Sequence, residues 1–217
     1  MSAKRIFIYS DQATDYLRAH DARLGAVIDA IGPIERKVDA DLFSSLMHSI
    51  VGQQISTKAH QTIWNRMIDA FGEITPEKIA ACSREELQKF GTTFKKVDYL
   101  KSAADKVLSG EFDLAMLEKL PDEEVCRRLC TLDGVGTWTA EMLMTFSMQR
   151  MDVMSFGDLA ILRGLRMVYH HRVITKDLFA KYQRRYSPYA TVASLYLWAV
   201  AGGAIDGMRD YAPKKRS

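Results

Sequence analysis

Residues 132–140 read LDGVGTWTA, and this short stretch decides how the rest of the chain is interpreted. Two glycines flank a single valine, and a tryptophan stands two residues after the second glycine. Because glycine has no Cβ, Gly134 and Gly136 permit a sharp turn between two helices and let a bulky group approach the backbone. Val135 is expected to anchor that turn in the core. The stretch therefore predicts a tight hairpin that joins two α-helices.

The start of the second of these helices is suited to an anion. The amides of Gly136, Thr137 and Trp138 have no carbonyl partner one turn earlier, and the helix dipole adds a partial positive charge. A helix–hairpin–helix of this type holds the phosphate backbone of DNA without reading its sequence. We therefore expect phosphate binding by Gly134, Gly136, Thr137 and Thr139. A tight turn between helices that contacts no ligand is the alternative interpretation.

Hydrophobic residues recur at three- and four-residue spacing along most of the chain, which is the period of an α-helix. One such stripe runs from Leu42 to Val51 and the next from Ile55 to Phe71, with the break Gly52-Gln53-Gln54 between them. Strand-like alternation is confined to the short run 6–9. The pattern predicts an all-α fold of roughly ten helices with short loops, which suits a pair of helical lobes.

Capping and turn residues mark the helix ends. Thr75-Pro76 and the capping box of Ser83 with Glu86 indicate helix starts, and glycines indicate stops at Gly72, Gly91 and Gly110. The remaining helices are expected from Pro121 to about Thr131, from the hairpin to about Met148, from Asp158, after Thr175, and from Pro188 to Ala201.

The composition is that of a globular protein with a mild positive charge. Hydrophobic residues make up 47% of the 217 residues, enough for a core, and the net charge is +3. That charge is too small to demonstrate a nucleic-acid partner. It does permit a locally basic face, to which the tail Lys214–Arg216 would add weak phosphate attraction.

Cysteine usage and the N-terminus indicate a reducing compartment. Cys82, Cys126 and Cys130 form no CxxC pair and have no histidine at metal-ligand spacing, so we expect reduced thiols packed in helices. The apolar run near the N-terminus is too short for a signal peptide, and no stretch approaches membrane-spanning length, so no membrane partner is expected. The expected location is the cytoplasm of a bacterium or the nucleus of a eukaryote.

An aspartate follows the hairpin in a second informative segment. SFGDLA at 155–160 places Asp158 directly after a glycine at the start of an expected helix. Hairpin and aspartate together resemble the helix–hairpin–helix–GPD superfamily of DNA base-excision glycosylases, and within it the 3-methyladenine DNA glycosylase II group of the AlkA and MAG type. The segments that carry the resemblance are DLFSSLMHSIVGQQIS (41–56), FKKVDYL (94–100), the hairpin (132–140), SFGDLAILRGL (155–165) and SPYATVASLYLWA (187–199).

The resemblance implies a single glycosylase domain over residues 1–217, in the compact form that lacks the N-terminal β-rich domain of the bacterial AlkA type. Its two helical lobes would enclose a cleft for a base flipped out of the duplex. No cofactor is implied, because the four-cysteine cluster of the endonuclease III relatives is missing. No metal site is expected beyond a monovalent cation, for which the family leaves room at the carbonyls of Leu132 and Val135.

Asp158 is the catalytic residue that the family motif implies. Breaking the bond between a base and C1′ of deoxyribose passes through a sugar with oxocarbenium character, and a fixed carboxylate stabilises that positive charge. A helix N-terminus would also favour an ionised carboxylate at this position. The sequence leaves open whether Asp158 activates the attacking water or only stabilises the sugar cation. An ordinary aspartate N-cap is the alternative interpretation.

Trp138, Met142 and Trp198 are the residues that the resemblance implies for the base pocket. Trp138 stands where relatives that also cut the DNA strand carry a lysine nucleophile, and an indole cannot form a Schiff base. The enzyme is therefore expected to be monofunctional. Aromatic rings attract the positive charge of bases alkylated at N3 or N7. Met142 replaces a pocket tyrosine of the AlkA type, which leaves the lesion range open, and core packing is the alternative for Trp198.

Gln53 and Gln54 lie at the break between two expected helices and match the wedge loop of the family. Base flipping leaves a gap in the duplex that a protein side chain fills. The AlkA type carries a leucine at the position of Gln54, so amide hydrogen bonds would contribute to the plugging here. The sequence does not distinguish which glutamine is the wedge, and two solvated glutamines at a helix break are the alternative.

Four further basic residues are candidates for phosphate contacts, although charged residues on a helix usually form only a solvated face. These candidates are Lys95, Lys96, Arg163 and Arg166. The histidines at 48, 60, 170 and 171 receive no role.

The sequence thus predicts a monomeric, monofunctional DNA glycosylase that acts on double-stranded DNA and excises alkylated purines of the 3-methyladenine and 7-methylguanine type in base-excision repair. One alternative is a glycosylase of the same superfamily for deaminated or oxidised bases. The other is a module that binds lesions or bent DNA without cutting any bond, which would retain the glycines and would not need Asp158.

Overall fold

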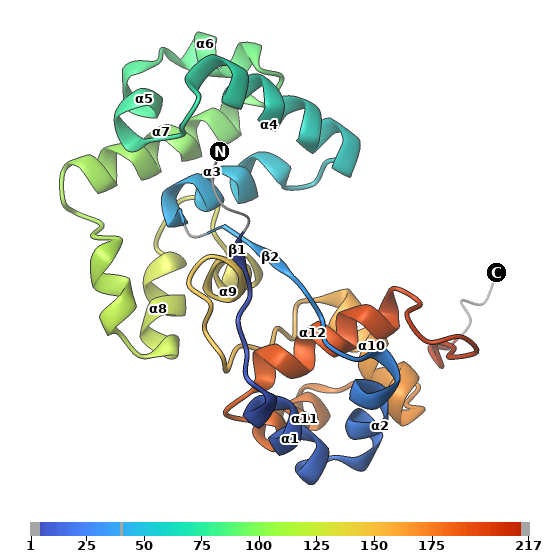
Figure 1. Ribbon diagram of the computed structural model, residues 1–217. Helices are drawn as coiled ribbons and strands as arrows, with labels where there is room; N and C mark the ends of the chain where they lie inside the picture. The colour runs from blue at the N-terminus through green and yellow to red at the C-terminus, as the bar shows by residue number, and fades with distance from the viewer. Residues whose placement is uncertain (1–4, 40, 214–217) are drawn as a thin grey trace. The chain divides into compact units, whose positions relative to one another are not determined.

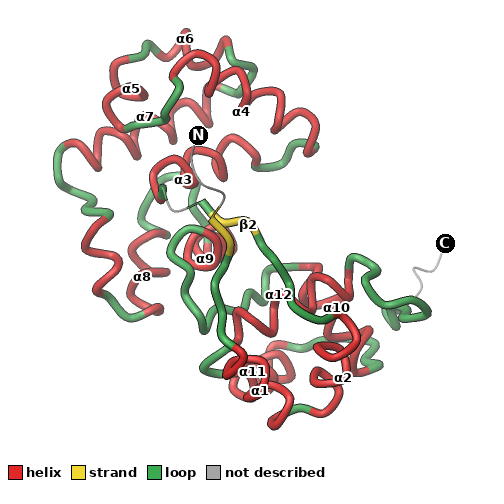
Figure 2. Tube along the Cα trace, in the orientation of Figure 1, coloured by secondary structure: helices red, strands yellow, loops and turns green. Residues whose placement is uncertain are grey.

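The computed structural model describes residues 5–39 and 41–213, and the basic tail Lys214–Arg216 lies outside these described residues. The chain divides into two compact units. The first combines the N-terminal segment up to Val38 with the segment from Gln149 onward, and the second is formed by Asp39–Met148. Figure 2 shows that helices make up most of both units. The prediction of an all-α fold is therefore confirmed.

The described residues form twelve α-helices, two more than the pattern predicts. The two that the sequence analysis missed lie near the N-terminus, α1 (Asp11–His20) and α2 (Ala22–Ile31). The strand-like run contributes only a two-residue strand β1 (Arg5–Ile6), which pairs antiparallel with β2 (Lys37–Val38). Figure 1 labels these two short strands.

The second unit contains the hairpin and the helices that support it. Its elements are α3 (Leu42–Gly52), α4 (Thr57–Phe71), α5 (Pro76–Ala81), α6 (Arg84–Lys89), α7 (Phe94–Leu108), a 3₁₀ turn (Ala115–Lys119), α8 (Asp122–Leu129) and α9 (Thr137–Phe146). Their starts follow the predicted caps: Thr75 accepts from the Lys78 amide, and Ser83 with Glu86 forms the capping box. Gly72 is the C-cap of α4, as predicted. The local signals were therefore sufficient to place most of these helices.

The first unit is built around a close pair of helices, α10 (Leu159–Tyr169) and α12 (Ala190–Ala201), with α11 (Lys176–Tyr186) also packed on α12. A Cβ added to Gly164 of α10 would lie 2.4 Å from the Leu197 carbonyl oxygen of α12. Only glycine allows the two backbones to approach so closely. This contact fixes the separation of the helices that carry Asp158 and Trp198.

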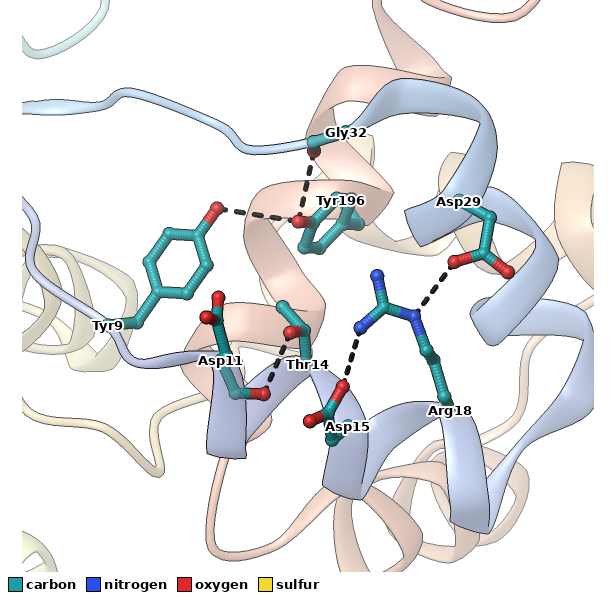
Figure 3. A network of polar contacts seen from close by, with 8 residues as sticks. All are labelled: Tyr9, Asp11, Thr14, Asp15, Arg18, Asp29, Gly32 and Tyr196. Atoms are coloured by element: carbon teal, nitrogen blue, oxygen red, sulfur yellow. Dashed lines mark hydrogen bonds and ion pairs between the residues drawn. The ribbon is translucent and has the colours of Figure 1, made fainter.

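A polar network ties the N-terminal segment to α12 (Figure 3). The Tyr196 hydroxyl donates to the Gly32 carbonyl at 3.1 Å and lies 3.4 Å from the Tyr9 hydroxyl. Arg18 of α1 pairs with Asp15 and with Asp29 of α2. These ion pairs are exposed and add little free energy, whereas the tyrosine contacts hold the buried helix α12 in register.

The described residues show where the three cysteines lie. Cys126 lies inside α8, whereas Cys82 and Cys130 are C-caps, and no disulfide links the three. The expectation that all three pack inside helices was therefore wrong in part. No helix in the described ranges combines the length and the hydropathy that crossing a bilayer requires.

Candidate functional site

Asp158 is the N-cap of α10, so the predicted helix start is confirmed. One carboxylate oxygen, Oδ1, accepts hydrogen bonds from the Ala160 amide at 2.9 Å and from the Ile161 amide at 3.0 Å. The Asp158 amide itself donates to the Ser155 carbonyl at 3.3 Å and closes the turn before the helix. The residue is 9% exposed. A nearly buried carboxylate is thus held in one orientation by the helix that it starts.

Trp198 of α12 lies against this carboxylate. Its indole Nε1 donates a hydrogen bond of 3.1 Å to Asp158 Oδ1. The two residues are 40 positions apart, and no local pattern in the sequence predicted their contact. Trp198 was expected to offer only an aromatic surface, and in the structure it is also a hydrogen-bond donor. The ring is half-buried, so one part of it remains accessible to solvent.

The arrangement stabilises negative charge at a fixed position. Three N–H groups meet on one oxygen of Asp158, and two of them belong to the first turn of α10, where the helix dipole also favours an anion. Hydrogen bonds to an ionised acceptor are about twice as strong as neutral ones. Such a carboxylate is suited to stabilise a neighbouring positive charge without rearranging during the reaction.

The predicted hairpin joins α8 to α9, and its two glycines have different roles. Gly134 has a φ of +79°, and a Cβ on it would lie 2.3 Å from the Tyr99 ring. Gly136 has a φ of −97°, which any residue can adopt, and its Cβ would meet nothing within 4 Å. The turn therefore requires glycine at 134. At 136 the missing side chain leaves the backbone open from outside. Val135 is buried, as expected.

The first turn of α9 begins at Gly136, which has no side chain with which to cap the helix. Thr137 is exposed, whereas the side chain of Thr139 is buried. A contact between Thr139 and a phosphate would therefore depend on its main-chain amide. Trp138 is 46% exposed, and Met142, one helical turn later, is half-buried. The two candidates for the base pocket thus share a partly accessible face of α9.

The two candidate wedge residues lie at the break between α3 and α4, and their contacts differ. Gln53 is the C-cap of α3, and its Nε2 donates to the Gly134 carbonyl of the hairpin at 2.7 Å. Gln54 is exposed and has a φ of +56°, in the left-handed region. Ile55 is 37% exposed in the loop. The prediction that Ile55 belongs to the apolar stripe of α4 was wrong, because the Ser56 cap starts that helix at Thr57.

Two of the four candidate phosphate contacts have partners inside the protein instead. Lys96 Nζ donates to the carbonyls of Val51 and Gln53, and Arg166 makes two hydrogen bonds to the carboxylate of Asp210. The salt bridge of Arg166 and the two part-buried carbonyl contacts of Lys96 occupy these donors, and sequence spacing alone did not reveal them. Lys95 and Arg163 are exposed.

No group of three or more histidine, cysteine or acidic side chains among the described residues is arranged to hold a metal ion. The carbonyl of Leu132, one of the two considered for a monovalent cation, accepts a hydrogen bond from the Val135 amide at 3.1 Å.

Two histidines that received no role do have partners: His60 Nε2 lies 3.0 Å from the His48 carbonyl. Burial, with a smaller effect of His60, lowers the pKa of His48 to about 4.

Comparison with known proteins gives the same family as the hairpin and the aspartate. The model of the HhH-GPD superfamily base excision DNA repair proteins matches residues 47–188. The DNA-3-methyladenine glycosylase 1 of Schizosaccharomyces pombe is 36% identical over 180 residues, which cover 80% of this chain and 78% of that protein.

Two solved structures are similar over nearly the whole chain. A DNA-3-methyladenine glycosidase from Bacillus halodurans is 34% identical, with a TM-score of 0.86, over 95% of this chain and 97% of the other. The 3-methyladenine DNA glycosylase of Schizosaccharomyces pombe in complex with abasic DNA is 29% identical, with a TM-score of 0.77, over 89% and 98%. This chain belongs to the HhH-GPD superfamily of base-excision DNA repair proteins.

Proposed function

We propose that the protein is a monofunctional DNA glycosylase that excises alkylated purines, of the 3-methyladenine and 7-methylguanine type, from double-stranded DNA. The observation that carries this proposal is the carboxylate of Asp158, which two helix amides and the Trp198 indole hold in place. The names of the relatives, DNA-3-methyladenine glycosylases, support the substrate class. We also propose that the protein belongs to the 3-methyladenine DNA glycosylase II group.

The reaction needs a charge stabiliser more than it needs an acid. As the bond from C1′ to the base nitrogen breaks, its electron pair leaves with the base, and the sugar gains positive charge. Asp158 stabilises that charge. Water then adds its oxygen to C1′ and releases a proton to Asp158 or to solvent. The products are a free base and an abasic site.

A purine methylated at N3 or N7 is a favourable leaving group, because its ring is cationic before cleavage and neutral afterwards. No general acid is required to protonate it. The half-buried indole of Trp198, directly beside Asp158, supplies an aromatic surface for such a cation. A desolvated cation–π contact contributes about 2 kcal/mol. Selection for alkylated bases would follow from this charge and from their weak glycosidic bonds.

The reaction stops at the abasic site because Trp138 has no amine. Bifunctional glycosylases cut the strand through a Schiff base between the sugar and a lysine, and an indole cannot form one. Trp138 is the second residue of α9, and the resemblance to the family aligns it with this lysine of the bifunctional relatives. The protein is therefore expected to leave the DNA strand intact.

DNA binding is assigned to the hairpin and the loop after α3. The open backbone at Gly136 and the first turn of α9 would bind a phosphate, and Gln54 would fill the gap left by the extruded base. The structure favours Gln54 over Gln53 for this role, because Gln54 is exposed while the Gln53 amide is bonded to the hairpin. Since a single chain contains all these elements, we propose that it acts as a monomer.

The decisive experiment is to incubate methylated duplex DNA with the protein and to identify the released bases by mass spectrometry. We expect free 3-methyladenine and 7-methylguanine, together with abasic sites in strands that break only after alkali treatment. Parallel duplexes with hypoxanthine or 8-oxoguanine test the substrate class. Release of those bases without alkylated ones would refute the alkylpurine assignment, and release of no base from any duplex would refute the enzyme.

A further inference from the structure

Helix α7 contains a lysine whose charge is used inside the protein. Lys96 Nζ donates to the carbonyl of Val51 at 2.8 Å and to the carbonyl of Gln53 at 2.5 Å. These carbonyls lie in the last turn and at the C-cap of α3, where a helix leaves its acceptors without intrahelical partners. A cation at this end also interacts favourably with the helix dipole. Burial lowers the pKa of Lys96, as expected for an ammonium that has lost water.

The segment that Lys96 holds leads directly into the 53–56 loop, which contains the proposed wedge. Gln54 has a φ of +56°, a left-handed conformation that is unfavourable for a residue with a side chain. It persists only when its surroundings fix it. Gln53, the residue before it, is held by two hydrogen bonds. Its main-chain carbonyl accepts from Lys96, and its side-chain amide donates to the Gly134 carbonyl.

The same face of α7 continues to the hairpin. Tyr99, three residues after Lys96, packs against Gly134. One turn further, the Ser102 hydroxyl donates to Asp133 Oδ2 at 2.7 Å. Lys106 lies 3.9 Å from the same carboxylate. One stripe of α7 therefore supports both the 53–56 loop and the turn of the hairpin.

We propose that Lys96 is a positioning residue for base extrusion, whose two carbonyl contacts hold the 53–56 loop in a fixed place relative to the hairpin. The inference rests on the proposed function, because it assigns a purpose to the loop. It also replaces the expectation that Lys96 binds phosphate. Helix α7 would then couple two events, phosphate binding by the hairpin and insertion of the 53–56 loop into the duplex. When the hairpin binds the DNA backbone, the loop would lie at a fixed position relative to the target base.

The chain offers a matched control on the same helix. Lys101 Nζ donates to the carbonyls of Ala80 and Cys82 at 2.9 and 2.7 Å, which is the same kind of contact at the end of α5. Both lysines are half-buried. Substituting methionine removes the charge and preserves most of the aliphatic length in either case. A general loss of helix capping would therefore affect the two variants alike.

The first test compares K96M and K101M on an alkylated base that is paired in a duplex and on the same base in an unpaired bulge. We expect K96M to slow single-turnover release from the paired site by about 10- to 100-fold, the usual effect of misplacing a reacting group by about 1 Å. The bulged base, already out of the stack, should be released within about threefold of the wild-type rate. K101M should resemble the wild type on both substrates.

The second test separates positioning from phosphate binding. Losing one phosphate contact reduces the slope of log affinity against log salt by about 0.9. We expect K96M to retain the wild-type slope, measured on an undamaged duplex. A slope reduced by about one unit, equal slowing on paired and bulged bases, or an equal defect in K101M would each overturn the proposal.

Lys96→Gln is measured alongside, because its neutral amide NH2 can still donate to a carbonyl and should help the variant to fold. Should K96M fail to fold, K96Q is judged by the same criteria. Failure of the proposed function is distinguishable, since the wild type would then release no base from either substrate. In that case, the salt slope still reports whether Lys96 binds phosphate.

Discussion

The first turns of α9 and α10 both present backbone amides, but the two helices differ in what those amides can bind. In α10 the first-turn amides bind the carboxylate of Asp158, and the Trp198 indole binds the same oxygen. In α9 the N-cap is Gly136, which has no side chain to offer. Elsewhere the helix starts are commonly closed by a side chain, as at Asp21, Asp41, Ser56, Thr75, Ser83, Thr93 and Thr175.

This difference agrees with the two roles proposed above, catalysis at the start of α10 and phosphate binding at the start of α9. A carboxylate from the chain itself gives α10 a permanent internal anion, whereas a glycine keeps the start of α9 open to an anion from outside. If this contrast is correct, substitutions at α10 should change the chemical step, and substitutions at Gly136 should change DNA binding. Four variants test that separation.

The largest effect is expected for D158N. The amide oxygen of asparagine can still accept the hydrogen bonds from Ala160, Ile161 and Trp198, so the helix start should persist while the negative charge is lost. Base release should fall by about 10²- to 10³-fold in single-turnover measurements, the range for removing one preorganised electrostatic group. DNA affinity should stay within a few-fold of the wild type. Release that is nearly unchanged would contradict the assignment of Asp158.

G134A should destabilise the fold more than any other change in the hairpin. Alanine at a φ of +79° is strained, and its methyl group would collide with the Tyr99 ring. The expected loss in the free energy of unfolding is about 2–4 kcal/mol, measured by urea denaturation. G136A is the control, with an expected change below about 0.5 kcal/mol. Equal losses in the two variants would remove the distinction between the glycines.

W198F should slow catalysis moderately. Phenylalanine keeps an aromatic ring beside Asp158 but removes the N–H donor to its Oδ1. A hydrogen bond to a charged group contributes about 1.5–3 kcal/mol, so we expect at least a tenfold lower rate of base release. The matched control is W64F, at another half-buried tryptophan, in α4. A similar decrease in both variants would attribute the effect to lost packing.

The smallest effect is expected for DNA binding by G136A. The added methyl group meets nothing in the protein, so only an external ligand can sense it. We expect an affinity for undamaged duplex about 3- to 10-fold weaker, with the rate of base release at saturating protein unchanged, since crowding one phosphate contact costs about 1 kcal/mol. Affinity equal to that of the wild type would argue that α9 does not contact the backbone.

The sequence predicted those features that local patterns encode. Periodicity and caps placed the helices from α3 onward, and the hairpin glycines and the Asp158 cap were found because they lie within a few residues of the turns that need them. The hydrophobic pattern started α4 at Ile55, two residues before its actual start at Thr57, because hydrophobicity alone does not reveal the Ser56 cap.

Long-range contacts were beyond local patterns. The bonds from Trp198 to Asp158, from Gln53 to Gly134 and from Lys96 to α3 join residues 40 or more positions apart. They depend on how helices pack, which spacing along the chain does not encode. The same reason explains why Lys96 and Arg166 resembled surface cations in the sequence.

The close contact of Gly164 with the Leu197 carbonyl has a practical consequence for altering this protein. Gly164 has no side chain and no proposed role in the chemistry, yet any side chain there would push α10 away from α12 and stretch the hydrogen bond between the indole and the carboxylate. Engineering that samples only residues able to touch a substrate would overlook it. A library seeking changed turnover should hold glycine at 164 and vary the accessible face of α9 instead.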